Sequence, residues 1–381
     1  MIYLDNAATT LKKPDRVYDA VNDCLRNYCA NPGRGSHKLA MKALGKIYET
    51  RENLSKLFNV DNPMSIVFTS NATEALNLSI KGFLKSGDHV ITTSIEHNSV
   101  IRPIKNLEKF NIENTIVKCD KNGFLDVNDI EKAIKKNTKL IVTTHASNVC
   151  GSIIDIKSIG NISKKYGIKY LVDASQTAGV YDIDVLDMNI DMLAVTGHKN
   201  LFGIQGSGIL YVNKNIELDE LKQGGTGSSS LKLIQPNVYP DKYESGTPNT
   251  PAIVSLNEGV KFILETTTKK IREKEEELCE YMIGKLLLID GVTVYGSHDS
   301  KKRSSVISIN IDNLDSGEIS FILDNEFDIL TRPGIHCSPL CHETIGTLKQ
   351  GAVRFSIGYF NTKEEIDKTI EALKSIKLML S

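Results

Sequence analysis

A lysine that follows a hydrophobic run is the first residue of this sequence whose position suggests chemistry. The segment Val195-Thr196-Gly197-His198-Lys199 begins apolar and ends in a polar turn. A lysine on a turn is usually a solvated surface charge. Held against a carbonyl compound, it becomes instead a Schiff-base nucleophile, because burial and neighbouring groups lower its pKa. The segment alone leaves both interpretations open.

Asp173 ends an earlier apolar run, one strand–helix–strand step before Lys199. A buried carboxylate needs a partner, because an unpaired buried charge is costly. The partner is either an ordinary helix cap or ion pair, or the pyridine nitrogen of pyridoxal 5′-phosphate (PLP), which withdraws electrons only when it is protonated. In the second case Asp173 and Lys199 face one pocket, at the ends of strands in the same sheet.

Two further segments offer groups that suit a phosphate and a flat ring. Asn71 and Glu74 have the spacing of a capping box, and the free N–H groups at such a helix start attract an anion. A plain capped helix explains this segment equally well. His97 follows the run that ends at Thr93. It is either a structural hydrogen-bonding residue or an imidazole that stacks on a cofactor and moves protons.

A loop constrained by Pro and Gly places Cys337 beside His336 and shortly after Arg332. Nearby positive groups make the nucleophilic thiolate available. An inert loop cysteine is one alternative, and a zinc site formed by Cys337, Cys341 and His342 is another. The zinc interpretation lacks a second pair of ligands at the usual spacing, so we predict no metal site.

Arg354 interrupts an apolar run, where a solvated charge is unexpected. Its guanidinium fits a carboxylate through two parallel hydrogen bonds, which suits an amino-acid substrate. An internal salt bridge explains the same position equally well.

The elements that must position these residues follow from the alternation of short β-branched runs with helix-like stretches. The pattern predicts βαβ units around a largely parallel sheet, with ligand residues just past the strand ends. Strands are expected at residues 66–68, 89–93, 140–144, 170–172, 192–195 and 209–212. A Gly/Ser-rich loop and one long helix near residues 254–290 lead into a second α/β region. We therefore predict a large cofactor-binding domain at 16–255 and a small domain at 1–15 and 256–381 that carries the Cys337 loop.

Composition narrows the classes of function. The formal net charge of -1 gives no reason to expect nucleic acid or an anionic membrane as a partner. No apolar run reaches the roughly 18 residues of a membrane span. The segment MIYLDNAATT has no signal-peptide features, so we expect a cytoplasmic protein. Seven cysteines, an odd number, argue against a disulfide framework.

In this order the motifs resemble the fold-type I PLP enzymes of the class V aminotransferase group, and within it the cysteine desulfurases of the SufS and NifS type. The resemblance runs from Tyr3 to Thr362. It implies an α/β fold with a mostly parallel, seven-stranded type of sheet and a smaller C-terminal α/β domain. Its most specific pieces are Asn71-Ala72-Thr73-Glu74-Ala75, His145-Ala146-Ser147-Asn148-Val149, Val172-Asp173-Ala174-Ser175-Gln176, Thr196-Gly197-His198-Lys199 and Arg332-Pro333-Gly334-Ile335-His336-Cys337.

The resemblance also implies roles for single residues. Lys199 holds PLP and moves the Cα proton, His97 stacks on the ring, and Cys337 is the nucleophile. The implied cofactor-binding residues are Ala72, Thr73, His97, Asn148, Asp173, Gln176, Thr196, His198, Lys199 and, across a dimer interface, Thr247. The implied substrate-binding residues are Asn148, Arg354, Arg332 and His37.

The implied activity converts L-cysteine to L-alanine and leaves the sulfur on Cys337 as a persulfide. A sulfur-acceptor protein, for example in iron–sulfur cluster assembly, and a homodimer are the expected partners. One alternative is a selenocysteine lyase, which depends less on Cys337 because selenium leaves more easily than sulfur. The other is a class V aminotransferase without desulfurase activity.

The nucleophile loop departs from the family pattern at two places. Ile335 stands where the short-loop desulfurases have the first of two histidines, and Ser338-Pro339 follow the cysteine directly. The missing imidazole bears on how the substrate thiol loses its proton. Cys341 lies outside the usual motif and is either a bystander or a relay thiol.

Overall fold

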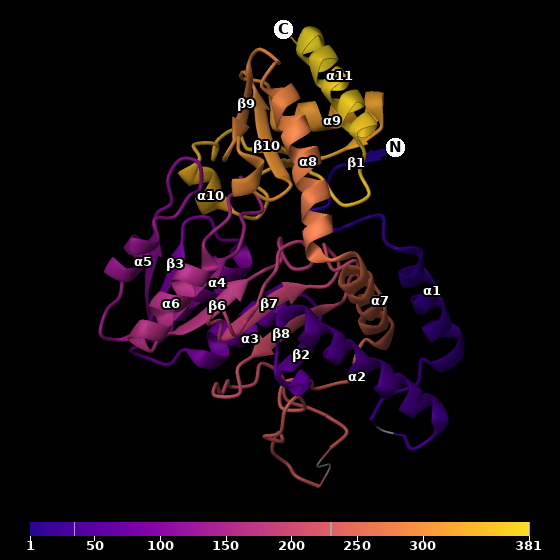
Figure 1. The fold of residues 1–381 in the computed structure, drawn as a ribbon. Coiled ribbons are helices and arrows are strands. Elements are labelled where there is room, and N and C mark those ends of the chain that lie inside the picture. The colour runs from indigo at the N-terminus through magenta and orange to yellow at the C-terminus, as the bar shows by residue number, and fades with distance from the viewer. Residues whose placement is uncertain (34, 229–230, 381) are drawn as a thin grey trace.

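A seven-stranded sheet forms the larger layer of the computed structural model, which describes residues 1–33, 35–228 and 231–380 (Figure 1). All neighbouring strands are parallel except that β8 runs antiparallel to both of its neighbours. In spatial order the strands are β2 (Ile66–Thr69), β8 (Gly208–Val212), β7 (Met192–Thr196), β6 (Lys169–Asp173), β5 (Thr138–Thr144), β3 (His89–Thr93) and β4 (Glu113–Val117).

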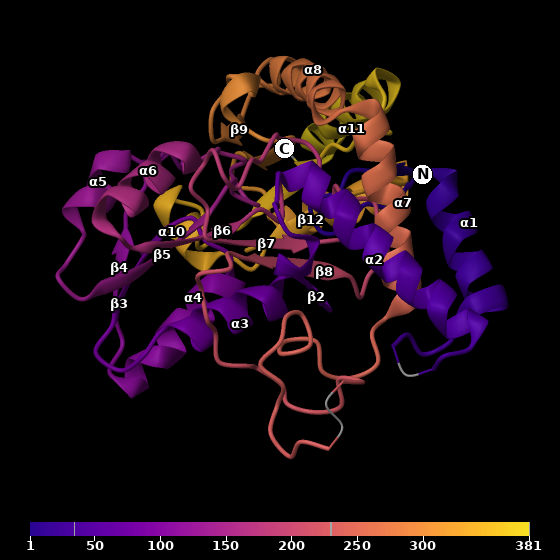
Figure 2. The same cartoon turned by 60° about the horizontal axis from the view of Figure 1, so that its bottom comes forward.

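Successive residues of the central strands point to opposite faces, and both faces are covered by helices. Leu193 and Val195 of β7 pack with one group of helices, whereas Met192 and Ala194 pack with the other. The first group is α2 (Lys38–Phe58), α6 (Ile156–Tyr166) and α7 (Thr250–Thr266), and the second is α3 (Ala72–Phe83) and α4 (Asn98–Leu107) (Figure 2). Burial on both faces explains why these strands read as continuous apolar runs.

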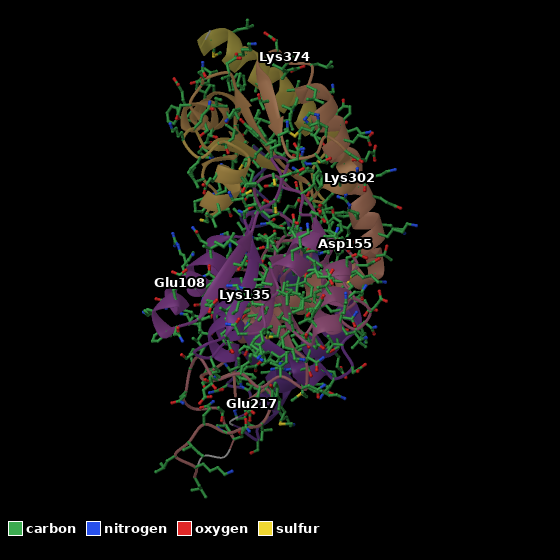
Figure 3. All side chains as sticks on the ribbon, turned by 90° about the vertical axis from the view of Figure 1, so that its left-hand side faces the viewer. Glu108, Lys135, Asp155, Glu217, Lys302 and Lys374 are labelled. Carbon is green, nitrogen blue, oxygen red and sulfur yellow. The ribbon has the colours of Figure 1, made fainter. Side chains whose placement is uncertain are left out.

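A smaller antiparallel sheet forms the second layer, above the first in the side view (Figure 3). Its order is β12 (Arg332–Gly334), β13 (Ala352–Ser356), β10 (Val306–Ile311) and β9 (Val292–Tyr295). It shares a core with α8 (Thr268–Leu286), α9 (Ser316–Phe327) and α11 (Lys363–Leu380). The remaining helices are α1 (Asp15–Asp23), α5 (Val127–Lys132) and α10 (Pro339–Thr344).

The N-terminal segment belongs to this smaller layer. β1 (Ile2–Tyr3) pairs in parallel with β11 (Ile329–Leu330), and Asp5 forms a bridge with Ser356. These pairings carry residues 5–9 across the edge of the large sheet. The first residues of the chain are thereby brought to the ends of β6 and β7, as the contacts of Ala7 and Thr9 with Gln176 and His198 show.

The expectation of one long helix near residues 254–290 was wrong. Thr267 has a φ of 78°, which breaks the run into α7 and α8. Its side chain accepts a hydrogen bond from the Lys270 backbone N–H and so caps α8. Neither Gly nor Pro marks this break, and for that reason the hydrophobic pattern did not reveal it. No helix in the described part of the chain is long and apolar enough to cross a membrane.

Candidate active site

A cavity of about 210 Å³ lies where the strand ends of the large sheet meet the smaller layer. It brings together residues that are far apart in the chain and that the sequence singled out. Eleven of the predicted site residues line it: Ala72, Thr73, His97, Asn148, Asp173, Gln176, Thr196, His198, Lys199, Arg332 and Arg354.

Lys199 follows β7 and projects into this cavity. Burial lowers the pKa of its amine, the charge of Asp173 opposes that shift, and the charges of Arg354 and Arg332 add to it, which together leave the pKa at about 8. The amine is therefore largely uncharged at mildly alkaline pH, which a nucleophilic lysine requires.

Asp173 is the last residue of β6, the strand beside β7. Its Oδ1 accepts hydrogen bonds from the Ser175 backbone N–H at 3.0 Å and from the Ser175 hydroxyl at 2.5 Å. Both bonds fall on one oxygen of a buried carboxylate that lines the cavity. Asp173 is thus oriented by its own turn and still offers Oδ2 to a cation such as a protonated ring nitrogen.

His97 caps α4, and its contacts define where its proton lies. Nδ1 accepts the Ser99 backbone N–H at 3.1 Å, so the hydrogen of the neutral ring is on Nε2. The Ser99 hydroxyl lies 2.9 Å from Nδ1 and 2.8 Å from the Thr73 hydroxyl. Burial lowers the pKa of His97 to about 4 against the opposing charge of Asp173, which keeps the ring neutral at physiological pH.

The start of α3 has the donors that a phosphate needs. Asn71 caps α3 as predicted, with the Glu74 N–H donating to Asn71 Oδ1 at 3.0 Å, whereas Glu74 Oε2 accepts the N–H of Ser70 at 2.7 Å in place of that of Asn71. A Cβ on Gly208 would lie 2.7 Å from the Asn71 backbone, so the strand approaches the helix start closely. The buried Thr196 hydroxyl has no hydrogen-bond partner among the described residues. This set fits the phosphate of PLP.

Arg354 forms the internal salt bridge that the sequence left open, and it also lines the cavity. One amino group donates to Asp5 Oδ1 at 2.6 Å and the other to the Asn148 carbonyl at 3.1 Å. Its buried Nε has no hydrogen-bond partner within the described ranges. Sequence reasoning missed Asp5, although it belongs to the N-terminal motif, because the ion pair joins residues at opposite ends of the chain.

Cys337 lies at the mouth of the cavity rather than in its lining, on an exposed turn. An amino nitrogen of Arg332 lies 3.6 Å from Cys337 Sγ, so the sulfur is next to the positive charge of the guanidinium. His336 and Cys337 both have left-handed backbones, with φ of 51° and 59°. Such consecutive non-glycine residues are unfavourable and need surrounding contacts to hold them.

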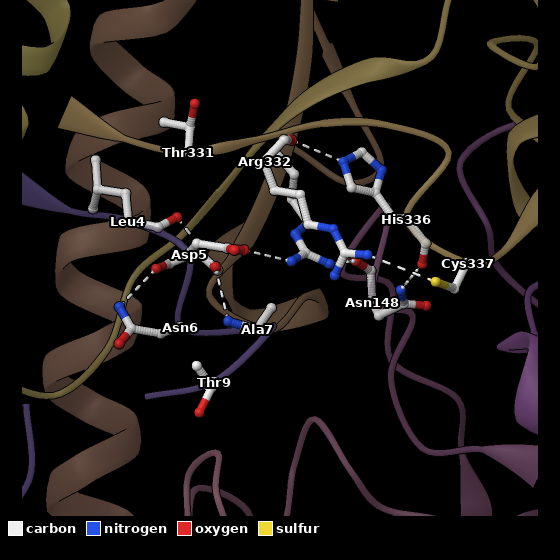
Figure 4. A network of polar contacts seen from close by, with 12 residues as sticks. Leu4, Asp5, Asn6, Ala7, Thr9, Asn148, Thr331, Arg332, His336 and Cys337 are labelled. Carbon is white, nitrogen blue, oxygen red and sulfur yellow. Dashed lines mark hydrogen bonds and ion pairs between the residues drawn. The ribbon is translucent and has the colours of Figure 1, made fainter. Parts of the chain in front are cut away.

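Asn148 supplies those contacts from the large layer (Figure 4). Its side-chain amide donates to the His336 carbonyl at 2.8 Å, and its Oδ1 accepts the Ser338 hydroxyl at 2.8 Å. The backbone N–H of Asn98 donates to the Cys337 carbonyl at 2.8 Å. The residues on either side of Cys337 are therefore fastened to one asparagine, a role that the sequence did not reveal.

The two histidines of the loop act as neutral hydrogen-bonding residues. His336 Nε2 lies 2.9 Å from the Arg332 carbonyl, which only accepts, so this nitrogen carries the hydrogen. His342 Nε2 then donates to His336 Nδ1 at 3.0 Å, and the Thr347 hydroxyl donates to His342 Nδ1 at 2.7 Å. Across the described residues, no group of three or more His, Cys, Asp or Glu side chains could hold a metal ion.

Two residues of the predicted site do not reach this cavity within one chain. His37 caps α2 through a 3.3 Å contact from the Ala40 backbone N–H. Thr247 accepts a hydrogen bond from the Asn31 side chain at 3.3 Å and lines a separate hollow beside Glu74. The other predicted residues line this cavity, except for Cys337 at its rim.

Known proteins resemble this chain over its whole length. Residues 2–369 match the family model described as aminotransferase class-V. A "Probable cysteine desulfurase" of Borreliella burgdorferi is 36% identical over 100% of this chain and 93% of its own length. One of Methanothermobacter thermautotrophicus is 34% identical over 98% and 94%. The apo structure of a cysteine desulfurase from Thermococcus onnurineus superposes with a TM-score of 0.93 at 31% identity, covering 98% of this chain and 94% of that one.

Proposed function

The chain belongs to the class V aminotransferase family, among its PLP-dependent cysteine desulfurases, and on that basis we propose that Cys337 takes the sulfur of L-cysteine as a persulfide. One observation carries the proposal. An exposed cysteine on a strained turn is held at the mouth of the cavity by Asn148 and accompanied by the guanidinium of Arg332. Exposure leaves its sulfur free to pass on what it receives.

The cavity residues divide into those that hold PLP and those that hold the amino acid. Asp173 would bind the ring nitrogen, His97 would cover the ring, Gln176 would contact the ring hydroxyl, and Thr73, Thr196 and His198 would bind the phosphate. When bound, PLP withdraws electrons from the α-carbon of the amino acid. Lys199 would anchor the cofactor through its amine.

The substrate carboxylate meets Arg354, whose buried Nε–H has no hydrogen-bond partner among the described residues. Asp5 already occupies one amino group of that guanidinium, so the incoming carboxylate shares or displaces it. Lys199, once its amine is released, takes the Cα proton as a general base and returns it later. Neutral Nε2–H of His97 remains a donor throughout.

Sulfur transfer is then a displacement at the substrate sulfur. The thiolate of Cys337 forms the new S–S bond while the Cβ–S bond breaks, and the bonding electrons pass to the carbon fragment. Protonation of that fragment gives alanine. Because Ile335 stands in place of an imidazole, the proton of the substrate thiol must go to another group or to water.

Mass spectrometry of the holoenzyme after one equivalent of L-cysteine tests this proposal. We expect an additional sulfur on the peptide that contains Cys337, which a reductant removes. An additional sulfur on a different cysteine, with Cys337 unmodified, would contradict it. A persulfide on an exposed residue also implies an acceptor protein with a thiol of its own, as in iron–sulfur cluster assembly.

We further propose that two copies of the chain form a homodimer. Thr247 is placed away from the cavity of its own chain, in a hollow open to solvent. Helices α1 and α2 and the turn Cys24–Tyr28 after α1 also expose several large apolar side chains, namely Tyr18, Leu25, Leu39, Met41, Leu44 and Tyr48. An exposed apolar face of this kind is typical of a subunit contact. In such a dimer Thr247 and His37 would complete the site of the other copy.

A further inference from the structure

We propose that Cys150 and Cys341 form an oxidisable dithiol that closes to a disulfide and ties the nucleophile loop to the large layer. Their sulfur atoms lie 4.0 Å apart, although the residues are 191 positions apart in the chain. Both side chains are fully buried, and each is a free thiol. Neither takes part in the desulfurase chemistry described above.

A single hydroxyl group organises the pair. Ser147 Oγ lies 3.4 Å from Cys341 Sγ and accepts the backbone N–H of Cys150 at 3.3 Å. The hydrogen bond from Cys341 lowers the pKa of Cys150 below the ordinary value of a thiol, whereas the same contact and burial raise the pKa of Cys341. Cys150 therefore loses its proton more easily than Cys341 does, which is the difference between two thiols that a reactive dithiol needs.

The sulfur atoms must close from contact distance to a bond of about 2.0 Å. This closure requires both side chains to rotate about their Cα–Cβ bonds. Space beside Cys150 comes from Gly123, where a Cβ would lie only 2.5 Å from the Cys150 sulfur. Because residue 123 is a glycine, the Cys150 sulfur occupies space that a larger side chain at residue 123 would fill.

A peroxide is the oxidant class that the pair would meet. The Cys150 thiolate attacks one peroxide oxygen, and the O–O bond breaks. Hydroxide is the leaving group, and Cys150 becomes a sulfenic acid. The Cys341 thiol then attacks that sulfur, an S–S bond forms and water leaves. Two thiols are oxidised to one disulfide while one hydrogen peroxide is reduced to two waters.

The disulfide would act on the loop that carries Cys337. Cys341 lies in α10, which begins directly after Ser338, and Cys150 lies in the same turn as Asn148. Asn148 already holds both flanks of Cys337 by hydrogen bonds. A covalent link between the turn and α10 would therefore fix the mouth of the cavity, so oxidation would restrain the loop that must release its sulfur.

Peptide mapping of the native holoenzyme tests the pair without any turnover. The protein is treated with limiting hydrogen peroxide, denatured in iodoacetamide to block every remaining thiol, and digested without reductant. We expect a cross-linked pair of peptides that contain Cys150 and Cys341, and its loss after dithiothreitol. If Cys150 and Cys341 are both alkylated in a sample in which the exposed Cys29 and Cys337 have been oxidised, the proposal is wrong. A disulfide from Cys341 to Cys337 or to Cys119 would also overturn it.

Three variants sharpen the result. Cys150→Ala and Cys341→Ala should each abolish the cross-link. Cys279→Ala removes another fully buried thiol, which lies 3.8 Å from the Ser304 carbonyl, and should leave the cross-link intact. A cross-link that disappears equally in all three variants would mean that it reflects loosened packing rather than this dithiol. Because the mapping needs no substrate, its failure would leave the assignment of Cys337 untouched.

Discussion

Lys199 lies among charges that act on its pKa in opposite directions. Burial, Arg354 and Arg332 favour the neutral amine, and Asp173 favours the ammonium. The balance is a pKa of about 8 in place of the ordinary value of 10.5. One buried lysine therefore becomes the reactive amine of the cavity through its surroundings alone, which the sequence could suggest but not quantify.

The pKa of Lys199 predicts how the apoenzyme takes up PLP. Only the free amine attacks the aldehyde, so the rate of uptake should rise with pH and level off above about 8. Asp173→Asn removes the charge that raises this pKa and should shift the rise to lower pH. Stopped-flow absorbance of PLP binding measures both. A rise centred near 10.5 in the native protein would contradict the assigned environment.

Arg354 should govern the affinity for the substrate. Arg354→Lys keeps the charge beside Asp5 but loses the planar fork, so KM for L-cysteine should rise about 10-fold or more. PLP content, read from its absorbance, should stay native because Arg354 is not part of the predicted PLP set. An unchanged KM with a loss of PLP would instead place Arg354 among the cofactor residues.

The turn that carries Cys337 is stabilised by a residue outside it, Asn148. Two left-handed residues in succession, His336 and Cys337, are stabilised by the contacts of Asn148 with the His336 carbonyl and the Ser338 hydroxyl. The Ser338 departure from the family motif thus has a structural role, because its hydroxyl completes the contacts around Asn148. The sequence motif identified the loop but did not reveal that Asn148 stabilises it.

Ser338→Ala should slow persulfide formation on Cys337. The lost hydrogen bond is worth about 1 kcal/mol, so the single-turnover rate should fall roughly 3- to 10-fold while KM changes little. Ser338→Thr keeps a hydroxyl and should restore most of the rate. Equal losses in both variants would show that side-chain volume, and not the bond to Asn148, controls the turn.

Local sequence patterns predict some elements of the fold and miss others. The strand runs and the helix cap at Asn71 follow from the sequence because each depends on neighbours in the chain. The edge strand β4, with its half-exposed residues, lacks a clear pattern and was not anticipated. The break at Thr267 and the ion pair of Asp5 with Arg354 were missed because they depend on packing between distant segments.

At the scale of the whole molecule, the two layers meet along the active site. The large sheet supplies Lys199, Asp173 and His97, whereas the smaller layer supplies Arg354 and the Cys337 turn. The N-terminal segment joins the two layers, because Asp5 pairs with Ser356 of the smaller layer while Ala7 and Thr9 contact Gln176 and His198 of the larger one. The division at residues 255 and 256 remains a proposal, and that position lies inside α7.

The dimer proposal makes its own prediction. Thr247→Ala should leave the mass of the assembly in solution unchanged but should speed PLP release about 5- to 10-fold, as expected for one hydrogen bond to a charged phosphate. Sedimentation and PLP exchange measure the two quantities. Native PLP retention in this variant, in a protein that sediments as a dimer, would remove Thr247 from the site.

Alanine release from L-cysteine is the most direct measure of the account as a whole. The native holoenzyme, Cys337→Ala and Cys29→Ala should be compared at equal PLP content with a reductant present, since Cys29 is a second exposed thiol outside the cavity. We predict alanine from the native protein and Cys29→Ala, and essentially none from Cys337→Ala. Similar rates from all three would contradict sulfur transfer through Cys337.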